Sequence, residues 1–237
     1  MKILWKSELD IVKTAPSYFR GAFVHEDQTL NYYFFSSIME ISHISLNIEN
    51  GALLHIQKNG TDAIQENVRQ YSTRKLPEHY CFDDFIFDNY RIAHHGEWGY
   101  VCFKNQKPIW KKSLKGYLYT DIIKNNNHIV FGTSGYGGHF YAIDIDTGEI
   151  IFDFNTKGTS SFFCANDSYY FCSKEKKTTK LYRIDFEGRI LDMIEIDGVY
   201  HDYACPMMLK DNWFCVVTLV EKKKDVFVPI ITCVALQ

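Results

Sequence analysis

Histidine and acidic side chains gather in three stretches of the sequence, and these residue types are the ones best suited to chemistry. The stretches are 94–98, 134–139 and 200–203, and their members of this kind are His94, His95, Glu97, His139, His201 and Asp202. Such side chains can bind metal ions or transfer protons. Their spacing matches no metal-ligand pattern, and only a fold could bring the three stretches together. The pattern favours polar loops, and we predict neither a metal nor a cofactor.

Two aspartates occupy matching places in the sequence and suggest a second kind of chemistry. Asp83 lies five residues before Asp88, and Asp121 lies five residues before Asn126, in the polar turn that follows. Two carboxylates facing each other across a small channel would suit glycoside hydrolysis. An Asp at a strand end more often bonds backbone amides, which favours a structural role. A glycan-acting hydrolase that uses Asp83, Asp121 and His201 is therefore the alternative, and a non-enzymatic protein is favoured.

Composition and charge narrow the classes of protein further. The chain has 237 residues, a formal net charge of −3 and an aromatic content of 16%. It lacks the basic charge expected of a nucleic-acid-binding protein. No apolar run approaches the roughly 20 residues of a membrane helix, and the N-terminus does not read as a signal peptide. Most of the seven cysteines lie in apolar runs. We expect reduced thiols and a cytoplasmic, monomeric protein.

The elements that would position these residues are strands, because one pattern repeats along the chain. The segment 140–152 reads as strand, tight turn and strand, and the segment 181–191 repeats it, with Tyr182 in the place of Tyr141. Looser copies occupy 100–110 and 44–54. A period of about 41 residues indicates a four-stranded blade of a β-propeller.

Five polar turns, each followed by an apolar strand, give the expected number of blades. The turns are 25–28, 88–89, 125–127, 166–167 and 211–212, and the strands are 30–36, 90–94, 129–132, 169–172 and 213–219. The last segment looks like a third strand without a fourth, and residues 3–9 look like a fourth strand without a third. We therefore expect the termini to share one blade, which would remove exposed sheet edges.

The predicted fold is all-β, a single five-bladed β-propeller of four-stranded antiparallel blades that fills 1–237. A polar insertion, 58–77, separates the first two blades. The blades are expected at 17–57, 78–114, 116–154, 160–196, and 203–237 together with 1–9.

One repeat resembles the repeat of the quinoprotein (PQQ-type) propellers, whose pattern is Ala-x-Asp-x-x-Thr-Gly-Lys-x-x-Trp. The matching residues are Ala142, Asp144, Thr147 and Gly148, with Glu149 in place of Lys and Phe152 in place of Trp. The copy that ends at Trp110 keeps the Trp, and the copy with Asp185 keeps Gly188. The resemblance implies a propeller scaffold. It does not imply quinone binding, because five blades depart from the eight of the quinoprotein dehydrogenases.

The favoured function is recognition of a protein or small ligand on one face of the propeller, for example by an immunity-type protein that neutralises a toxin. Exposed Trp and Tyr side chains are efficient anchors. The predicted binding residues are Arg20, Trp98, Tyr136, His139, Tyr200, His201 and Tyr203. Two basic runs, 174–177 and 221–224, are expected at hairpin tips, where they could form a basic rim for an acidic partner. A lectin-like sugar binder is a further alternative.

Overall fold

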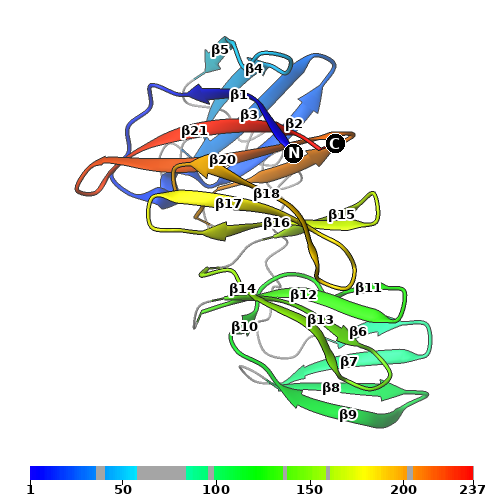
Figure 1. The fold of residues 1–237 in the computed structure, drawn as a ribbon. Coiled ribbons are helices and arrows are strands. Elements are labelled where there is room, and N and C mark those ends of the chain that lie inside the picture. Colours follow the sequence, from blue (N-terminus) through cyan, green and yellow to red (C-terminus); the bar gives the residue numbers. More distant parts are fainter. Residues whose placement is uncertain are drawn as a thin grey trace. The chain divides into compact units, whose positions relative to one another are not determined.

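The computed structural model describes residues 1–35, 41–57, 84–95, 99–135, 138–158, 161–201 and 205–236. Apart from one short 3-10 helix, η1 (Pro16–Phe19), the elements in these ranges are β-strands. The strands form five antiparallel sheets (Figure 1). An all-β chain of antiparallel sheets, as predicted from the repeat, is confirmed. No helix in the described ranges has the length and apolar character needed to cross a membrane.

Three of the sheets each contain four strands that follow one another in the sequence. The first contains β2 (Gly21–Glu26), β3 (Thr29–Phe35), β4 (Ile41–Asn47) and β5 (Leu53–Gln57). The second contains β6 (Asp84–Phe87), β7 (Tyr90–His95), β8 (Gly99–Lys104) and β9 (Lys107–Ser113). A later one contains β15 (Phe162–Ala165), β16 (Ser168–Lys174), β17 (Thr178–Ile184) and β18 (Ile190–Asp197).

The third sheet departs from the expected four strands because its first strand is interrupted. Its strands are β10 (Tyr117–Leu118), β11 (Ile123–Asn125), β12 (His128–Ser134), β13 (His139–Asp144) and β14 (Ile150–Asn155), and both β10 and β11 pair with β12. Between them, the Gly132 amide donates to Thr120 Oγ1 (2.8 Å), and the Gly132 carbonyl accepts from the Tyr119 and Thr120 amides. These bonds replace the regular ladder, so the sheet has five strands.

The two ends of the chain share one sheet, as predicted. Its order is β1 (Lys2–Glu8), β21 (Val226–Ala235), β20 (Trp213–Lys223) and β19 (Met207–Lys210). β1 pairs antiparallel with β21, from Lys2 opposite Ala235 to Glu8 opposite Ile230. The N-terminal strand therefore covers the edge that β21 would otherwise leave unpaired.

Asp and Asn side chains explain why the predicted turns form between the first two strands of each sheet. Asp27, Asp88, Asn126, Asp167 and Asp211 all adopt positive φ, between 49° and 53°. Asn and Asp tolerate this left-handed conformation better than other residues with a side chain. The polar turns of the sequence are thus confirmed as tight hairpin turns.

In three places, an aromatic side chain on an edge strand of one sheet packs against a glycine in a hairpin of another sheet. Trp5 Nε1 donates to the Ile48 carbonyl (2.7 Å), and Trp110 Nε1 donates to the Ile145 carbonyl (2.8 Å). A Cβ added to the nearby glycine would come within 2.4–2.7 Å of the aromatic side chain in each case. The pairs are Trp5 with Gly51, Trp110 with Gly148, and Phe152 with Gly188. The glycine of the repeat therefore provides both the turn and a flat surface for a neighbouring ring.

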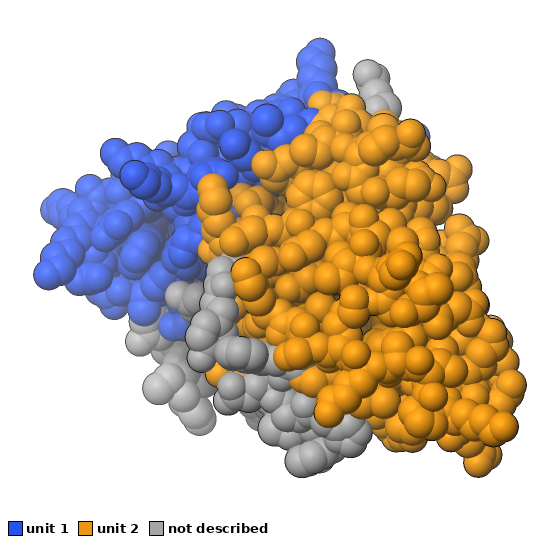
Figure 2. Space-filling model, turned by 60° about the horizontal axis from the view of Figure 1, so that its bottom comes forward, with its two compact units in different colours: residues 1–73, 174–181, 193–237 blue, residues 74–173, 182–192 orange. Residues whose placement is uncertain are grey.

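The chain divides into two compact units (Figure 2). Unit 1 contains residues 1–73, 174–181 and 193–237, and unit 2 contains residues 74–173 and 182–192. The core of unit 2 is aromatic: Phe140 and Phe171 have ring centroids 4.8 Å apart, and Tyr100 and Phe131 have centroids 5.0 Å apart. A single closed domain, the predicted blade boundaries and the number of blades stay predictions. The predicted insertion 58–77 lies outside the described residues.

Candidate ligand-binding site

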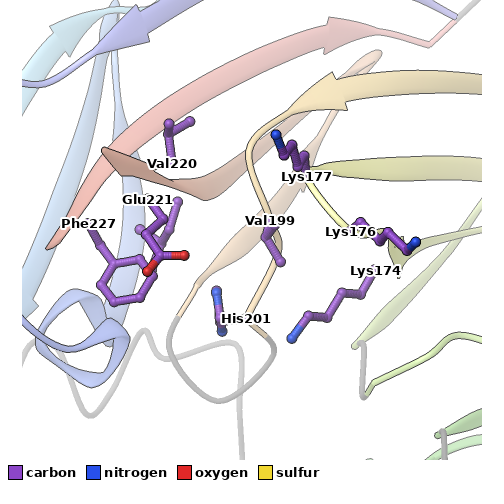
Figure 3. Close-up of a pocket in the computed structure, with 9 residues that line it drawn as sticks. Lys174, Lys176, Lys177, Val199, His201, Val220, Glu221 and Phe227 are labelled. Atoms are coloured by element: carbon purple, nitrogen blue, oxygen red, sulfur yellow. The ribbon is translucent and has the colours of Figure 1, made fainter. Parts of the chain in front are cut away.

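The described residues of unit 1 form a pocket that is a candidate binding site. Its volume is ≈ 580 Å³. Three segments supply its walls: the β16–β17 turn, the connection that follows β18, and the β20–β21 hairpin (Figure 3). The lining residues are Lys174, Lys176, Lys177, Val199, His201, Leu219, Val220, Glu221 and Phe227. We refer to it as the basic pocket.

The connection after β18 is held in place from both sides, which fixes the middle of the pocket. On one side, Thr179 Oγ1 donates to the Gly198 carbonyl (2.9 Å). On the other side, Val199 and Leu219 exchange two backbone hydrogen bonds, of 2.8 and 2.9 Å. Gly198 has φ +80°, and a Cβ there would come within 2.9 Å of Thr218 Oγ1. A glycine is needed at this position because of its conformation and the close packing.

The same hydrogen bonds decide which side chains of the connection face the pocket. The Tyr200 amide donates to Thr179 Oγ1 (2.7 Å), and the Tyr200 side chain is only 3% exposed. Val199 and His201, on either side of it, line the pocket. His201 was predicted as a binding residue, and it lies in this pocket. Tyr200 was predicted as an exposed anchor, but it is buried and holds the connection instead.

Positive charge predominates around the pocket. Lys174 ends β16, and Lys176 and Lys177 occupy the turn that follows. Within the described ranges, none of these three lysines has a carboxylate within ion-pair distance. Their neighbour Glu175 lies 3.7 Å from Lys180 instead. Glu221 is the one carboxylate in the described lining, so three lysines and one carboxylate share it.

The opposite wall of the pocket combines apolar surface with the Glu221 carboxylate. Phe227 is paired with Glu221 across β20 and β21, and its backbone also bonds to Lys13 (2.8 and 3.1 Å). The His201 ring meets the Phe227 ring edge-on, with centroids 6.1 Å apart. Figure 3 shows the three lysines on one side, Glu221 and Phe227 on the other, and Val199 and His201 between them.

This arrangement is suited to binding an anion with an apolar part. Lysines supply positive charge and hydrogen-bond donors, and Phe227, Leu219 and Val199 supply apolar contact. The Glu221 carboxylate accepts a hydrogen bond from the Asp225 amide (3.0 Å), which ties it to the hairpin turn. No group of three or more His, Cys, Asp or Glu side chains in the described part of the chain could hold a metal ion.

The other predicted site residues do not gather at this pocket. Arg20 follows η1 in unit 1, where it is exposed, and it does not line the pocket. In unit 2, His139 is 6% exposed, contacts the Asp153 carboxylate through Nδ1 and stacks on Tyr141 (5.4 Å between centroids). Asp121 has an exposed side chain just before β11. The predicted residues Asp83, Trp98, Tyr136 and Tyr203 lie outside the described residues.

Sequence reasoning found the charged part of the pocket and missed its apolar part. The two basic runs were expected at hairpin tips. The run 174–177 covers the end of β16 and the β16–β17 turn, whereas the run 221–224 lies mostly at the end of β20 and only its last residue is in the β20–β21 turn. The sequence does not mark Val199 and Phe227 as pocket residues, because each looks like an ordinary apolar residue of a strand. Their places depend on β-bridges to residues distant in the sequence, from Val199 to Leu219 and from Phe227 to Lys13.

Comparisons with known proteins give weak structural likenesses only. No protein-family model matches the sequence, and no curated protein matches it. Among solved structures, BamB from Moraxella catarrhalis is 12% identical, with a TM-score of 0.41; the match covers 90% of this chain and 59% of BamB. The WD40 β-propeller domain of Doa1 is 11% identical, with a TM-score of 0.39 and coverage of 88% and 62%. Quinohemoprotein alcohol dehydrogenase ADHIIG from Pseudomonas putida HK5 is 11% identical, with a TM-score of 0.40 and coverage of 92% and 40%.

Proposed function

We propose that this protein is a non-enzymatic recognition module whose partner binds at the basic pocket. The observation that carries the proposal is the combination of three lysines that have no carboxylate partner among the described residues and an apolar wall around ≈ 580 Å³ of space. Ligand sites of this kind fall in the range of about 300–1,000 Å³ and combine apolar lining with a few polar groups. The clamped connection at Gly198 holds the centre of the pocket, which reduces the ordering cost of binding.

We further propose that the five sheets are the blades of one closed ring. The support is the repeated contact between an aromatic on a last strand and a glycine in another hairpin, at Trp5, Trp110 and Phe152. Small-angle scattering tests this, because a compact chain of this length has a radius of gyration of about 18 Å. A clearly larger radius of gyration for the monomer would contradict the closed ring and leave the pocket untouched.

The partner that we propose is a protein, and a toxin neutralised by this chain is one specific case. The test is a pull-down from native lysate with the purified chain as bait, followed by mass photometry of the eluate. The pocket variant is Lys174→Gln/Lys176→Gln/Lys177→Gln. The matched control carries the same change at three exposed lysines outside the pocket: Lys107→Gln/Lys111→Gln/Lys210→Gln.

We expect the wild-type bait and the control to retain the same protein in a defined complex, and the pocket variant to lose it. Because both triple variants remove three positive charges, a loss shared by them would indicate non-specific charge attraction and would overturn the assignment to this pocket. Recovery of free monomer alone with the wild-type bait would overturn the proposal of a protein partner.

A further inference from the structure

We propose that the basic pocket binds an acidic peptide segment, with carboxylates beside Lys174, Lys176 and Lys177 and one large apolar side chain against Phe227. This inference rests on the proposed function and specifies the chemistry of the partner. The occupant follows from charge complementarity, because three lysines lie on one side of the pocket and an apolar surface lies on the other.

The positive wall calls for more than one negative group. Lys176 and Lys177 form the two-residue tip of a hairpin that the Glu175 amide closes on the Thr178 carbonyl (2.9 Å). Successive side chains at such a tip diverge, so a single small anion would not reach all three ammonium groups. A peptide with several carboxylates could contact each of them. The local excess of positive charge would also speed the encounter with such a segment.

The apolar wall calls for a large apolar side chain in the same ligand. Phe227 is held between two backbone partners, Lys13 and Glu221, and its ring is only partly buried. Leu219 and Val199 are joined by a β-bridge beside it. A rigid and partly exposed aromatic next to aliphatic side chains offers contact area at low entropic cost. An acidic but entirely polar ligand would leave this surface unused.

Glu221 sets a further condition on the ligand. Its carboxylate lies on the apolar wall, where Oε1 accepts a hydrogen bond from the Asp225 amide. A ligand carboxylate placed on that side would meet a like charge, which is unfavourable. The apolar side chain of the ligand should therefore face Glu221 and Phe227, with the acidic groups directed toward the lysines.

The test uses five synthetic pentapeptides, each with four glutamates and one phenylalanine, the phenylalanine occupying a different position in each. Binding is followed by chemical-shift changes of backbone amides in the ¹⁵N-labelled full chain, including Val199 and His201. The comparison probes are the matching glutamine peptides, a glutamate-alanine peptide and inorganic phosphate. Variants are the pocket and control lysine triples defined above, and Phe227→Leu.

We expect at least one glutamate–phenylalanine peptide to shift the pocket amides in a saturable way. Exposed ion pairs contribute about 0.2–1 kcal/mol each, so the three lysines together should change Kd by roughly 3- to 150-fold. The pocket variant should weaken binding by such a factor, and the control triple should bind within about twofold of wild type. Binding should also weaken when the salt concentration rises from about 50 to about 500 mM.

Several outcomes would overturn the inference. Equal binding of the glutamine peptides would exclude recognition of acidic groups, and equal binding of the alanine peptide would exclude the apolar contact. An unchanged Kd in Phe227→Leu would exclude a contact with the Phe227 ring. Tighter binding of phosphate than of every peptide would indicate a simple anion site. If no peptide shifts the pocket amides while the pocket variant still loses its partner in the pull-down, the acidic segment is wrong and the recognition function stands.

Discussion

Substitution of Gly148 by alanine should cost more stability than its turn conformation alone explains. Gly148 has φ +72°, and its added Cβ would come 2.7 Å from Trp110 Cγ and 2.9 Å from Trp110 Cδ2. Contacts this short cannot persist, so the indole ring must move away from the hairpin. The movement would break the hydrogen bond from Trp110 Nε1 to the Ile145 carbonyl.

The expected magnitude is the sum of three effects. The left-handed conformation costs an alanine about 1–2 kcal/mol. Loss of the indole hydrogen bond costs about 1 kcal/mol. Exposure of about 40 Å² of ring surface costs about another 1 kcal/mol, at about 25 cal/mol per Å². Gly148→Ala should therefore lower the free energy of unfolding by about 3–4 kcal/mol, of which about 2 kcal/mol depends on Trp110.

The assay is urea denaturation followed by circular dichroism, on a double-mutant cycle with Trp110→Leu. In the Trp110→Leu background, Gly148→Ala should cost only the conformational part, about 1–2 kcal/mol. Asn105→Ala provides a control for that part, because Asn105 is exposed and has φ 49° in the corresponding turn of β8–β9. An equal cost of Gly148→Ala in both backgrounds would refute the explanation that the ring contact requires glycine here.

Three other features of the structure lead to further predictions. The Tyr100 hydroxyl is buried without a hydrogen-bond partner among the described residues. Tyr100→Phe should therefore raise the free energy of unfolding by about 1 kcal/mol, and urea denaturation that shows a loss would argue for an unseen partner. Burial, followed by the neighbouring His55, lowers the pKa of His43, whereas Glu26 raises it. Because the folded-state pKa lies below the ordinary value of about 6.5, stability should fall as the pH drops below about 6.5 and level off below the folded-state pKa; thermal melts from about pH 7.5 to about pH 5 should show a smaller loss for His43→Gln. Deletion of residues 2–8 should expose the β21 edge and cause association, seen by light scattering. A deletion variant that stays monomeric and equally stable would contradict the role of β1.

The scaffold was largely predictable because its signals are local. The sequence of Asp144, Thr147 and the glycine that follows indicates a tight turn, because the bonds that form the turn lie within it. Asp144 Oδ1 accepts hydrogen bonds from the Asp146 and Thr147 amides, at 2.9 and 2.8 Å. Polar turns followed by apolar strands likewise act over a few residues. The break between β10 and β11 was not predictable, because it depends on the Thr120 side chain replacing a backbone acceptor for Gly132.

The site was predictable only in its charge. Lysines at a hairpin tip can be recognised from the turn and the run, and the structure places them at the pocket. The sequence could not say which of Val199, Tyr200 and His201 would face inward, because alternation alone allows two choices. The bond between the Tyr200 amide and Thr179 Oγ1 decides it, and its two partners are distant in the sequence.

Comparison of equivalent positions explains why the first repeat was also the loosest in the sequence. One row of paired residues crosses each of four sheets: Cys215, Cys233 and Trp5; Ile92, Cys102 and Trp110; Val130, Ala142 and Phe152; and Asn31, Ser45 and His55. The first three rows are apolar and end on a ring that packs against a glycine. The fourth is polar.

The polar row satisfies its own hydrogen bonds within the sheet β2–β5. Ser45 Oγ donates to Asn31 Oδ1 (2.7 Å), and His43 Nε2 lies 2.9 Å from the same oxygen. Asn31 and Ser45 are buried, so these hydrogen bonds offset the free energy lost when water is removed from their polar groups. All five residues of the edge strand β5 are exposed. The repeat pattern is weaker in this sheet because its row ends on His55, whereas each of the other three rows ends on an aromatic side chain that packs against a glycine.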